Sequence, residues 1–120
     1  MAERTLASAE RLRLDAEARG VANRAYYAVY QAATALCYEH GDESQFPHGW
    51  NNPSHDQLPD LIRKNGNLSL WTRRRISQLL NTMRSVREDA DYRPGRTVNI
   101  EIALEQLQNA ATVLRLLEGT

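Results

Sequence analysis

The feature that most constrains this 120-residue chain is a segment with two neighbouring stripes of mainly apolar side chains at helical spacing. Between residues 15 and 40, one stripe recurs every three to four positions and a second stripe runs beside it. The first comprises Ala22, Tyr26, Val29, Ala33, Leu36 and His40, and the second Tyr27, Tyr30, Thr34 and Cys37. A helix that is apolar on two neighbouring stripes must be covered on more than one side. We therefore expect it to lie at the centre of a bundle or at a dimer seam.

The rest of the chain divides into further helical segments. Three-and-four spacing and helix-favouring composition predict helices over residues 2–14, 15–39, 54–64, 69–91 and 99–117. Gly20 costs about 1 kcal/mol relative to Ala, so either packing needs the small residue or the second helix begins near Val21. No segment alternates with a period of two, so we predict no sheet. The expected fold is one domain, residues 1–120, an all-α up-and-down bundle of four to five helices.

Local signals mark where several of these helices start and stop. Ser54 is a predicted N-cap with Gln57 at the capping-box spacing, and Ser69 precedes the next start. Gly41 and the Pro94-Gly95 pair end helices. The predicted inward stripe of the last helix comprises Ile100, Ala103, Leu104, Leu107, Ala111, Leu114 and Leu117.

Cysteine content and hydropathy bound the cellular setting. The single cysteine, Cys37, cannot form an intramolecular disulfide, which favours a reducing compartment. No apolar run is long enough to cross a bilayer, and the first fifteen residues lack a signal-peptide stretch. We therefore expect a soluble, cytoplasmic protein that does not contact a membrane.

Charge is distributed unevenly, although the formal net charge is zero. The span 63–96 holds nine cations and three carboxylates, which leaves a local excess of six positive charges. A field of this kind can attract phosphate backbones. The alternative is a solvated helix face whose arginines serve only solubility.

Two motifs carry a resemblance to a known family. Residues 23–33 read Asn-Arg-Ala-Tyr-Tyr-Ala-Val-Tyr-Gln-Ala-Ala, and residues 87–92 read Arg-Glu-Asp-Ala-Asp-Tyr. Together with the weaker Ser54-His55 pair between them, and in this order and spacing, they resemble the signatures of small bacterial HEPN-domain proteins. The resemblance covers nearly the whole chain and implies a HEPN-like helical bundle that forms a homodimer.

The resemblance also implies a function. Nuclease branches of the family carry an Arg followed four to six residues later by a His, and two such pairs meet across a dimer. RNA is then cleaved by attack of its own 2′-hydroxyl, without a metal. The present chain departs from this pattern, because its last histidine is His55, and Asp91 and Tyr92 stand where a His is expected. His55 could still approach Arg87 in space, so the sequence leaves open whether the chain is an enzyme.

These residues define a candidate site. The proposed catalytic residues are Arg87, Tyr92 and His55, and the proposed RNA-binding residues are Arg84, Arg87, Arg93 and Arg96. Arginine binds phosphate oxygens through its planar fork, tyrosine donates a hydrogen bond to developing charge, and neutral imidazole accepts a proton. The alternatives are an intrahelical contact of Arg87 with Asp91, a Tyr92 that covers the end of the bundle, and a His55 that caps a helix.

Arg24 requires a separate explanation, because it lies on an otherwise largely apolar helix. A buried guanidinium must be paired, and Asp91 is the partner that the two motifs suggest. We therefore expect a structural Arg24–Asp91 ion pair that fixes the helix register. The alternative is an Arg24 that faces RNA in a cleft between subunits.

Two further groups of residues are candidate sites. His40, His48 and His55 are spaced by eight and seven residues, which matches no compact ligand motif, so we expect no metal and no cofactor. Phe46 and Trp50 lie in the polar loop, either as a lid on the bundle or as platforms that stack on RNA bases.

The leading hypothesis is an RNA-associated HEPN protein of a prokaryotic toxin–antitoxin or defence-like system. In its active form it is a metal-independent ribonuclease with an incomplete active-site motif. The hypothesis rests on family analogy, because a fold alone does not establish a function. The alternatives are a non-enzymatic binding module for a minimal nucleotidyltransferase-type antitoxin, and a structural dimer.

Overall fold

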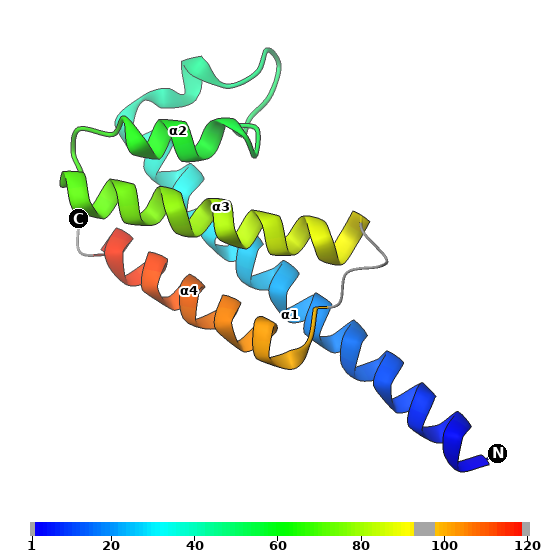
Figure 1. Cartoon of the computed structure of the whole chain (residues 1–120). Coiled ribbons are helices and arrows are strands. Elements are labelled where there is room, and N and C mark those ends of the chain that lie inside the picture. Colours follow the sequence, from blue (N-terminus) through cyan, green and yellow to red (C-terminus); the bar gives the residue numbers. More distant parts are fainter. Residues whose placement is uncertain (1, 93–97, 119–120) are drawn as a thin grey trace.

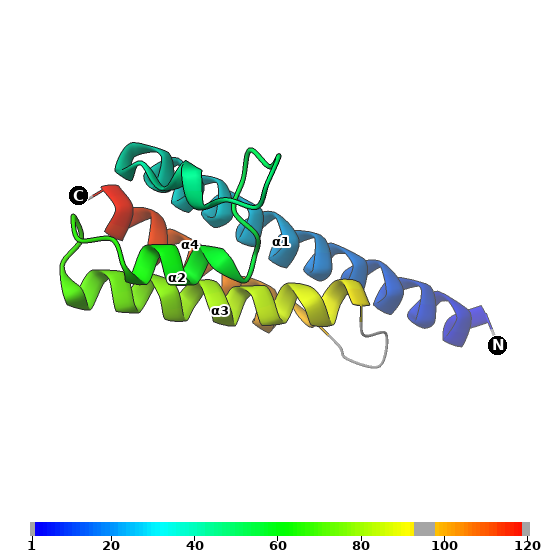
Figure 2. The same cartoon turned by 90° about the horizontal axis from the view of Figure 1, so that it is seen from above.

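The computed structural model describes the backbone of residues 2–92 and 98–118, and the side chains of residues 16–88 and 98–118. These residues form the helices α1 (Ala2–His40), α2 (Gln57–Arg63), α3 (Leu70–Tyr92) and α4 (Ile100–Glu118), with a short 3-10 turn at Asp42–Gln45. Helices α1, α3 and α4 form the body of the bundle, and α2 lies along the first half of α3 on the side away from α4 (Figures 1 and 2). The expected all-α bundle is confirmed.

Helix α1 is longer than predicted, because the two helices expected over 2–14 and 15–39 are one. Breaking a helix sacrifices several cooperative backbone hydrogen bonds, which costs more than the roughly 1 kcal/mol penalty of Gly20 inside it. A Cβ at Gly20 would meet only the end of the Arg24 side chain, at 3.4 Å, so packing does not require glycine there. The N-terminal part of α1 projects beyond the other helices (Figure 1).

The first stripe of α1 forms the centre of the core, as predicted. Its members Ala22, Tyr26, Val29 and Ala33 are at most 1% exposed, whereas Leu36 is only partly buried and His40 is exposed. The core residues that pack around this stripe include Leu58 and Ile62 of α2, Ile76, Leu80 and Met83 of α3, and Val113 of α4. The second stripe is mixed, because Cys37 is buried while Tyr27 is 38% exposed.

The predicted inward stripe of α4 is wrong at four positions. Ile100, Leu104 and Leu107 are about half exposed, Ala111 is exposed, and the buried residues are Ala103, Gln106, Ala110 and Val113. Apolar residues cover more than half of the circumference of this helix, so spacing alone does not select the inward face. The small side chains of Ala103 and Ala110 let α4 approach α1 closely, which favours that face over the leucines.

The short segments around α2 follow the expected capping signals in part. The Ser54 hydroxyl accepts a hydrogen bond from the Gln57 backbone N–H at 3.1 Å, although α2 itself begins only at Gln57. The Gln57 side chain does not complete a capping box, since it donates to the backbone carbonyl of Gln45. At the start of α3, the Ser69 hydroxyl accepts from the Thr72 N–H at 3.2 Å. No described helix is long and apolar enough to cross a membrane.

Candidate functional site

The structure brings His55 against tyrosines of α1. Nδ1 of His55 lies 2.6 Å from the hydroxyl oxygen of Tyr26, and the ring centroids of His55 and Tyr30 are 4.8 Å apart. The Tyr30 hydroxyl donates to the backbone carbonyl of Pro53 at 2.6 Å. Because Pro53 lies just before the turn into α2, this bond fixes the backbone that presents His55.

Arg87 reaches the same tyrosines from α3. Its Nη2 donates to the Tyr27 hydroxyl at 2.8 Å. Its guanidinium carbon lies 5.0 Å from the ring centroid of Tyr27 and 5.8 Å from that of Tyr26, in the range of a cation–π contact. Arg87 and His55, which are 32 residues apart in the sequence, therefore contact the same group of aromatic side chains.

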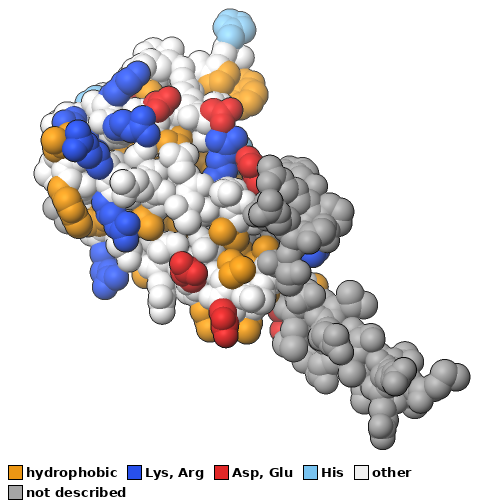
Figure 3. Space-filling view, in the orientation of Figure 1, with side chains coloured by type: hydrophobic (Ala, Val, Ile, Leu, Met, Phe, Trp, Pro, Cys, Tyr) orange, Lys and Arg blue, Asp and Glu red, His pale blue; other side chains and the backbone are white. Residues whose placement is uncertain are grey.

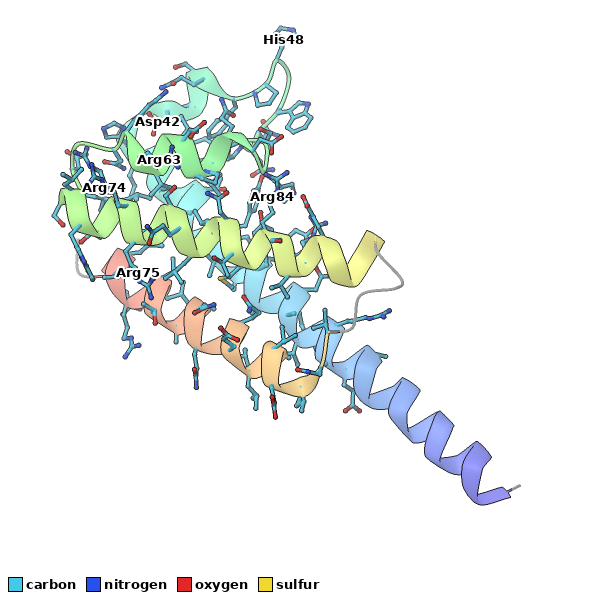
Figure 4. All side chains as sticks on the ribbon, viewed as in Figure 1. Asp42, His48, Arg63, Arg74, Arg75 and Arg84 are labelled. Atoms are coloured by element: carbon cyan, nitrogen blue, oxygen red, sulfur yellow. The ribbon has the colours of Figure 1, made fainter. Side chains whose placement is uncertain are left out.

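Arg84 lies one turn earlier on α3 and is held by carboxylates on both sides. It forms ion pairs with Asp56, which follows His55, and with Glu88, where Nε and Oε1 are 3.0 Å apart. These hydrogen bonds and charges raise the pKa of Arg84, although burial opposes the shift. Figure 4 shows Arg84 on the part of α3 that lies below the loop of His48. Its charge adds to the field of the site, but its Nε and Nη1 are already engaged by carboxylates.

The surroundings determine the charge states of the two central groups. Burial lowers the pKa of His55, and the positive charges of Arg87 and Arg84 lower it further. Burial raises the pKa of Tyr26 to about 12, against a partly opposing effect of the two arginines. At neutral pH the site therefore presents an uncharged imidazole and a protonated phenol beside a guanidinium.

A shallow hollow of about 440 Å³ borders this cluster at Tyr27. It follows the outer face of α1, and its lining residues are Gly20, Asn23, Arg24, Tyr27, Ala28 and Gln31. Arg24 is exposed here, which contradicts the buried setting that we expected for it. The side chains of Asp91, Tyr92, Arg93 and Arg96 lie outside the described residues, and with them the expected Arg24–Asp91 pair.

The remaining candidate groups lie apart from the cluster. His40 contacts Asp42 at 3.1 Å, and His48 lies at the tip of the loop (Figure 4). In that loop Phe46 is buried and packs on Tyr38, whereas Trp50 is 57% exposed. The lid interpretation therefore fits Phe46 and not Trp50. Among the described side chains, no group of three or more His, Cys, Asp or Glu residues could hold a metal ion.

The tyrosines are the site component that the sequence reasoning missed. We assigned Tyr26, Tyr27 and Tyr30 to packing stripes because their helical spacing is that of a core. The missed signal was their three hydroxyl groups, since a purely apolar core has no use for polar groups that need partners. The local sequence Tyr-Tyr-x-x-Tyr places these hydroxyls along one side of α1, where the segment before α2 and helix α3 supply the partners.

The fold and this cluster define a helical bundle in which signature residues from α1 and α3 meet beside the start of α2. A family model for the HEPN domain matches residues 1–120. The chain belongs to the HEPN family, a family of ribonuclease and toxin–antitoxin-associated modules, and the resemblance is confirmed. The comparisons found no similar curated protein and no similar solved structure.

Proposed function

We propose that this protein binds single-stranded RNA at the cluster of His55, Arg87, Tyr26 and Tyr27, and that it cleaves the strand slowly without a metal. The observation that supports the proposal is the meeting of His55 and Arg87 on neighbouring tyrosines. Each protomer thereby supplies both an imidazole and a guanidinium, the two groups that the family's nuclease branches use. His55, although distant from Arg87 in the sequence, takes the role of the histidine that is missing after Arg87.

Arg87 binds the phosphate in this proposal. Its planar fork suits two phosphate oxygens, and the bond to Tyr27 holds the side chain in position before RNA arrives. Arg84 contributes less, because Asp56 and Glu88 already engage its Nη1 and Nε and balance its charge. This assigns the larger effect on RNA binding to Arg87.

His55 serves as the general base. In the required tautomer, Nδ1–H donates to the Tyr26 oxygen and Nε2 accepts the proton of the RNA 2′-hydroxyl. The 2′-oxygen then bonds to the adjacent phosphorus, and the bond from phosphorus to the 5′-oxygen breaks. The products are a 2′,3′-cyclic phosphate and a 5′-hydroxyl whose proton comes from water. Because His40 and His48 lie elsewhere, no second imidazole protonates the leaving oxygen, and we expect low turnover.

A single strand fits the site better than a duplex. The hollow along α1 adjoins Tyr27, whose partly exposed ring can stack on an unpaired base. Arg24 and Gln31 line the same hollow and can contact the backbone and the base edge of a neighbouring nucleotide. In a duplex the bases are stacked on one another and cannot enter the hollow.

The test is cleavage of a labelled single-stranded RNA, with and without a chelator. We expect slow cleavage in both, a cyclic-phosphate end on the product, and no cleavage where the scissile nucleotide carries a 2′-deoxyribose. His55→Ala should reduce the rate by about 10²- to 10⁴-fold while RNA remains bound, and His48→Ala serves as the matched control. Equal rates in the His55→Ala variant and the wild type would contradict the proposed chemistry. A wild type that binds no RNA would favour a module that binds a nucleotidyltransferase-type protein.

A further inference from the structure

The segment from the end of α2 through most of α3 carries charged side chains of one sign only. Seven arginines and lysines, and no carboxylate, lie between Asp60 and Glu88 in the sequence. Arg74 and Arg75, both exposed in the first two turns of α3, form no ion pair or hydrogen bond with the described side chains. In the space-filling view, blue side chains gather over this end of α3 (Figure 3). Their charge is available to a partner outside the chain.

Large apolar side chains adjoin these two arginines. Leu70 and Trp71 are 49% and 67% exposed, and together with Arg74, Arg75 and Gln78 they line a hollow of about 320 Å³. We call these five residues the basic patch. Arginines that serve only solubility do not require an exposed indole beside them. An apolar centre that is bordered by charged side chains is instead typical of a surface that binds another protein.

The basic patch follows the axis of α3. All of its residues belong to this helix, and those from Trp71 to Gln78 recur at three-and-four spacing, which places them on one face. At a rise of 1.5 Å per residue, this row extends about 10 Å, or about two turns. A partner helix laid along α3 repeats with the same spacing, so its side chains can meet each turn of the patch.

We propose that the basic patch binds an acidic amphipathic helix of a different protein. An apolar side chain of that helix fills the hollow beside Trp71. Carboxylates one turn further along the same face accept hydrogen bonds from Arg74 and Arg75, whose planar forks suit two carboxylate oxygens each. Tryptophan and arginine are also the residues that contribute most to binding at protein interfaces.

Charge complementarity selects this occupant over two others. A second copy of this chain has a formal net charge of zero, so it is not attracted to the patch at long range, whereas an acidic protein is. RNA has the right sign of charge, but its sugar–phosphate backbone offers no apolar side chain to Leu70 and to the hollow. An acidic helix with an apolar face satisfies both parts of the patch.

The basic patch is separate from the candidate RNA site. Sixteen residues separate Trp71 from Arg87, which corresponds to about 24 Å along α3 and about half a turn around it. The patch and the His55–Arg87 cluster therefore lie on different sides of the helix, and an acidic partner leaves the cluster open to RNA. The inference does not rest on the proposed function.

Fluorescence anisotropy with a labelled peptide tests the proposal on the full chain. The probe is an alanine-based peptide of about 15 residues, which is long enough to form a helix in water. Its leucines and glutamates stand together on one face, with each leucine one turn before two glutamates. We expect a dissociation constant on the order of 100 µM. A scrambled peptide of the same composition should bind about tenfold more weakly, because its leucines and glutamates no longer share a face.

Matched variants locate the binding surface. Trp71→Ala should weaken peptide binding about tenfold, whereas Trp50→Ala, which removes the other exposed indole, should change it by less than about twofold. The double variant Arg74→Glu, Arg75→Glu should lose the acidic peptide and bind a peptide in which lysines replace the glutamates. Lys64→Glu reverses an exposed charge outside the patch and should keep the preference for the acidic peptide.

Several results would overturn the proposal. One is a wild type that binds no acidic peptide at about 1 mM, and another is equal affinity for the ordered and the scrambled peptide. Undiminished peptide binding in Trp71→Ala would exclude the hollow. If that variant also lost binding of single-stranded RNA, of phosphatidylserine vesicles or of a second copy, the patch would belong to that partner instead. Circular dichroism of each variant shows that a loss of binding is not a loss of folding.

Discussion

The two ends of α3 carry similar arginines in different surroundings. Near its end, Arg84 is held by Asp56 and Glu88, and Arg87 lies on Tyr27. At its start, Arg74 and Arg75 extend into solvent without an ionic contact in the part of the chain that the structure describes. Counted along the sequence, all four belong to one basic span. In space, Arg84 and Arg87 form one preorganised group, whereas Arg74 and Arg75 lie on an exposed surface.

The difference shows that the partners of a charge are more informative than its sign. A guanidinium that is already positioned loses little conformational freedom when a phosphate binds, so the Arg87 end suits a small, defined anion. Arginines that remain free and adjoin an exposed Trp71 suit a larger partner that orders them on binding.

The largest effect concerns stability and contrasts the buried and the exposed side of α3. Leu80 is 1% exposed, so Leu80→Ala should lower the free energy of unfolding by about 2–5 kcal/mol. Trp71→Ala removes a larger side chain but should cost less than about 1 kcal/mol in the monomer, because the indole is mostly in water. Urea denaturation at a concentration that keeps the chain monomeric measures both. Equal losses of unfolding free energy in the two variants would contradict the assignment of Leu80 to the core and of Trp71 to the surface.

The next effect concerns RNA affinity and contrasts Arg87 with Arg75. Arg87→Ala should weaken binding of a single-stranded oligonucleotide about tenfold or more and reduce the slope of affinity against salt by about one. Arg75→Ala should leave both nearly unchanged. Arg87→Lys should recover only part of the affinity, because lysine keeps the charge but loses the planar fork. Fluorescence anisotropy over a salt series provides the measurement. A larger loss of RNA affinity for Arg75→Ala than for Arg87→Ala would place the RNA at the start of α3 and contradict the proposed site.

Much of the fold could be predicted from the sequence because the decisive signals were local. The spacing of Tyr26, Val29 and Ala33 identified the central face of α1, and the serines at 54 and 69 accept hydrogen bonds from the starts of the following helices. The stripe of α4 could not be predicted, since Leu104 and Ala103 both have helical spacing and only the packed bundle selects the smaller residue. The position of a helix face depends on its neighbours when apolar residues surround most of the helix.

The sequence indicated some residues of the candidate site, but neither its tyrosines nor its arrangement. Motif resemblance indicated Arg87 and His55 separately, and only the fold brings both to the same tyrosines. The sequence could not show that the basic span divides into paired and unpaired arginines, because one of the two carboxylates that hold Arg84 is distant from it in the sequence. Glu88 lies one helical turn away, whereas Asp56 lies 28 residues earlier and becomes a neighbour only when α2 packs on α3.

A smaller effect on the free energy of unfolding is expected at alkaline pH from the buried phenol of Tyr26, which lies beside the Arg87 end of α3. Tyr26 has a pKa of about 12 in the folded chain and near 10 when unfolded, so its contribution to stability is complete below pH 10 and is lost as the pH rises toward 12. The loss between pH 10 and 11 should be about 1 kcal/mol. Tyr26→Phe should make the decline of the unfolding free energy with pH shallower by that amount in urea titrations. An identical pH dependence in the variant would show that the phenol is not shielded from water.

The smallest effect is a shift in the titration of His55, which reports on Arg87 directly. The imidazole should titrate below 6.5 in the folded chain, because burial and then the charges of Arg87 and Arg84 disfavour its protonated form. Arg87→Gln removes one of these causes and should move the pKa of His55 upward, whereas Arg75→Gln should not move it. Chemical shifts of the imidazole protons over a pH series measure each value. If His55 is the base, the acid limb of the cleavage profile must move upward with its pKa, since only the neutral imidazole accepts the 2′-hydroxyl proton. A limb that stays in place while the titration shifts would separate the imidazole from the chemistry and leave Arg87 as a binding residue alone.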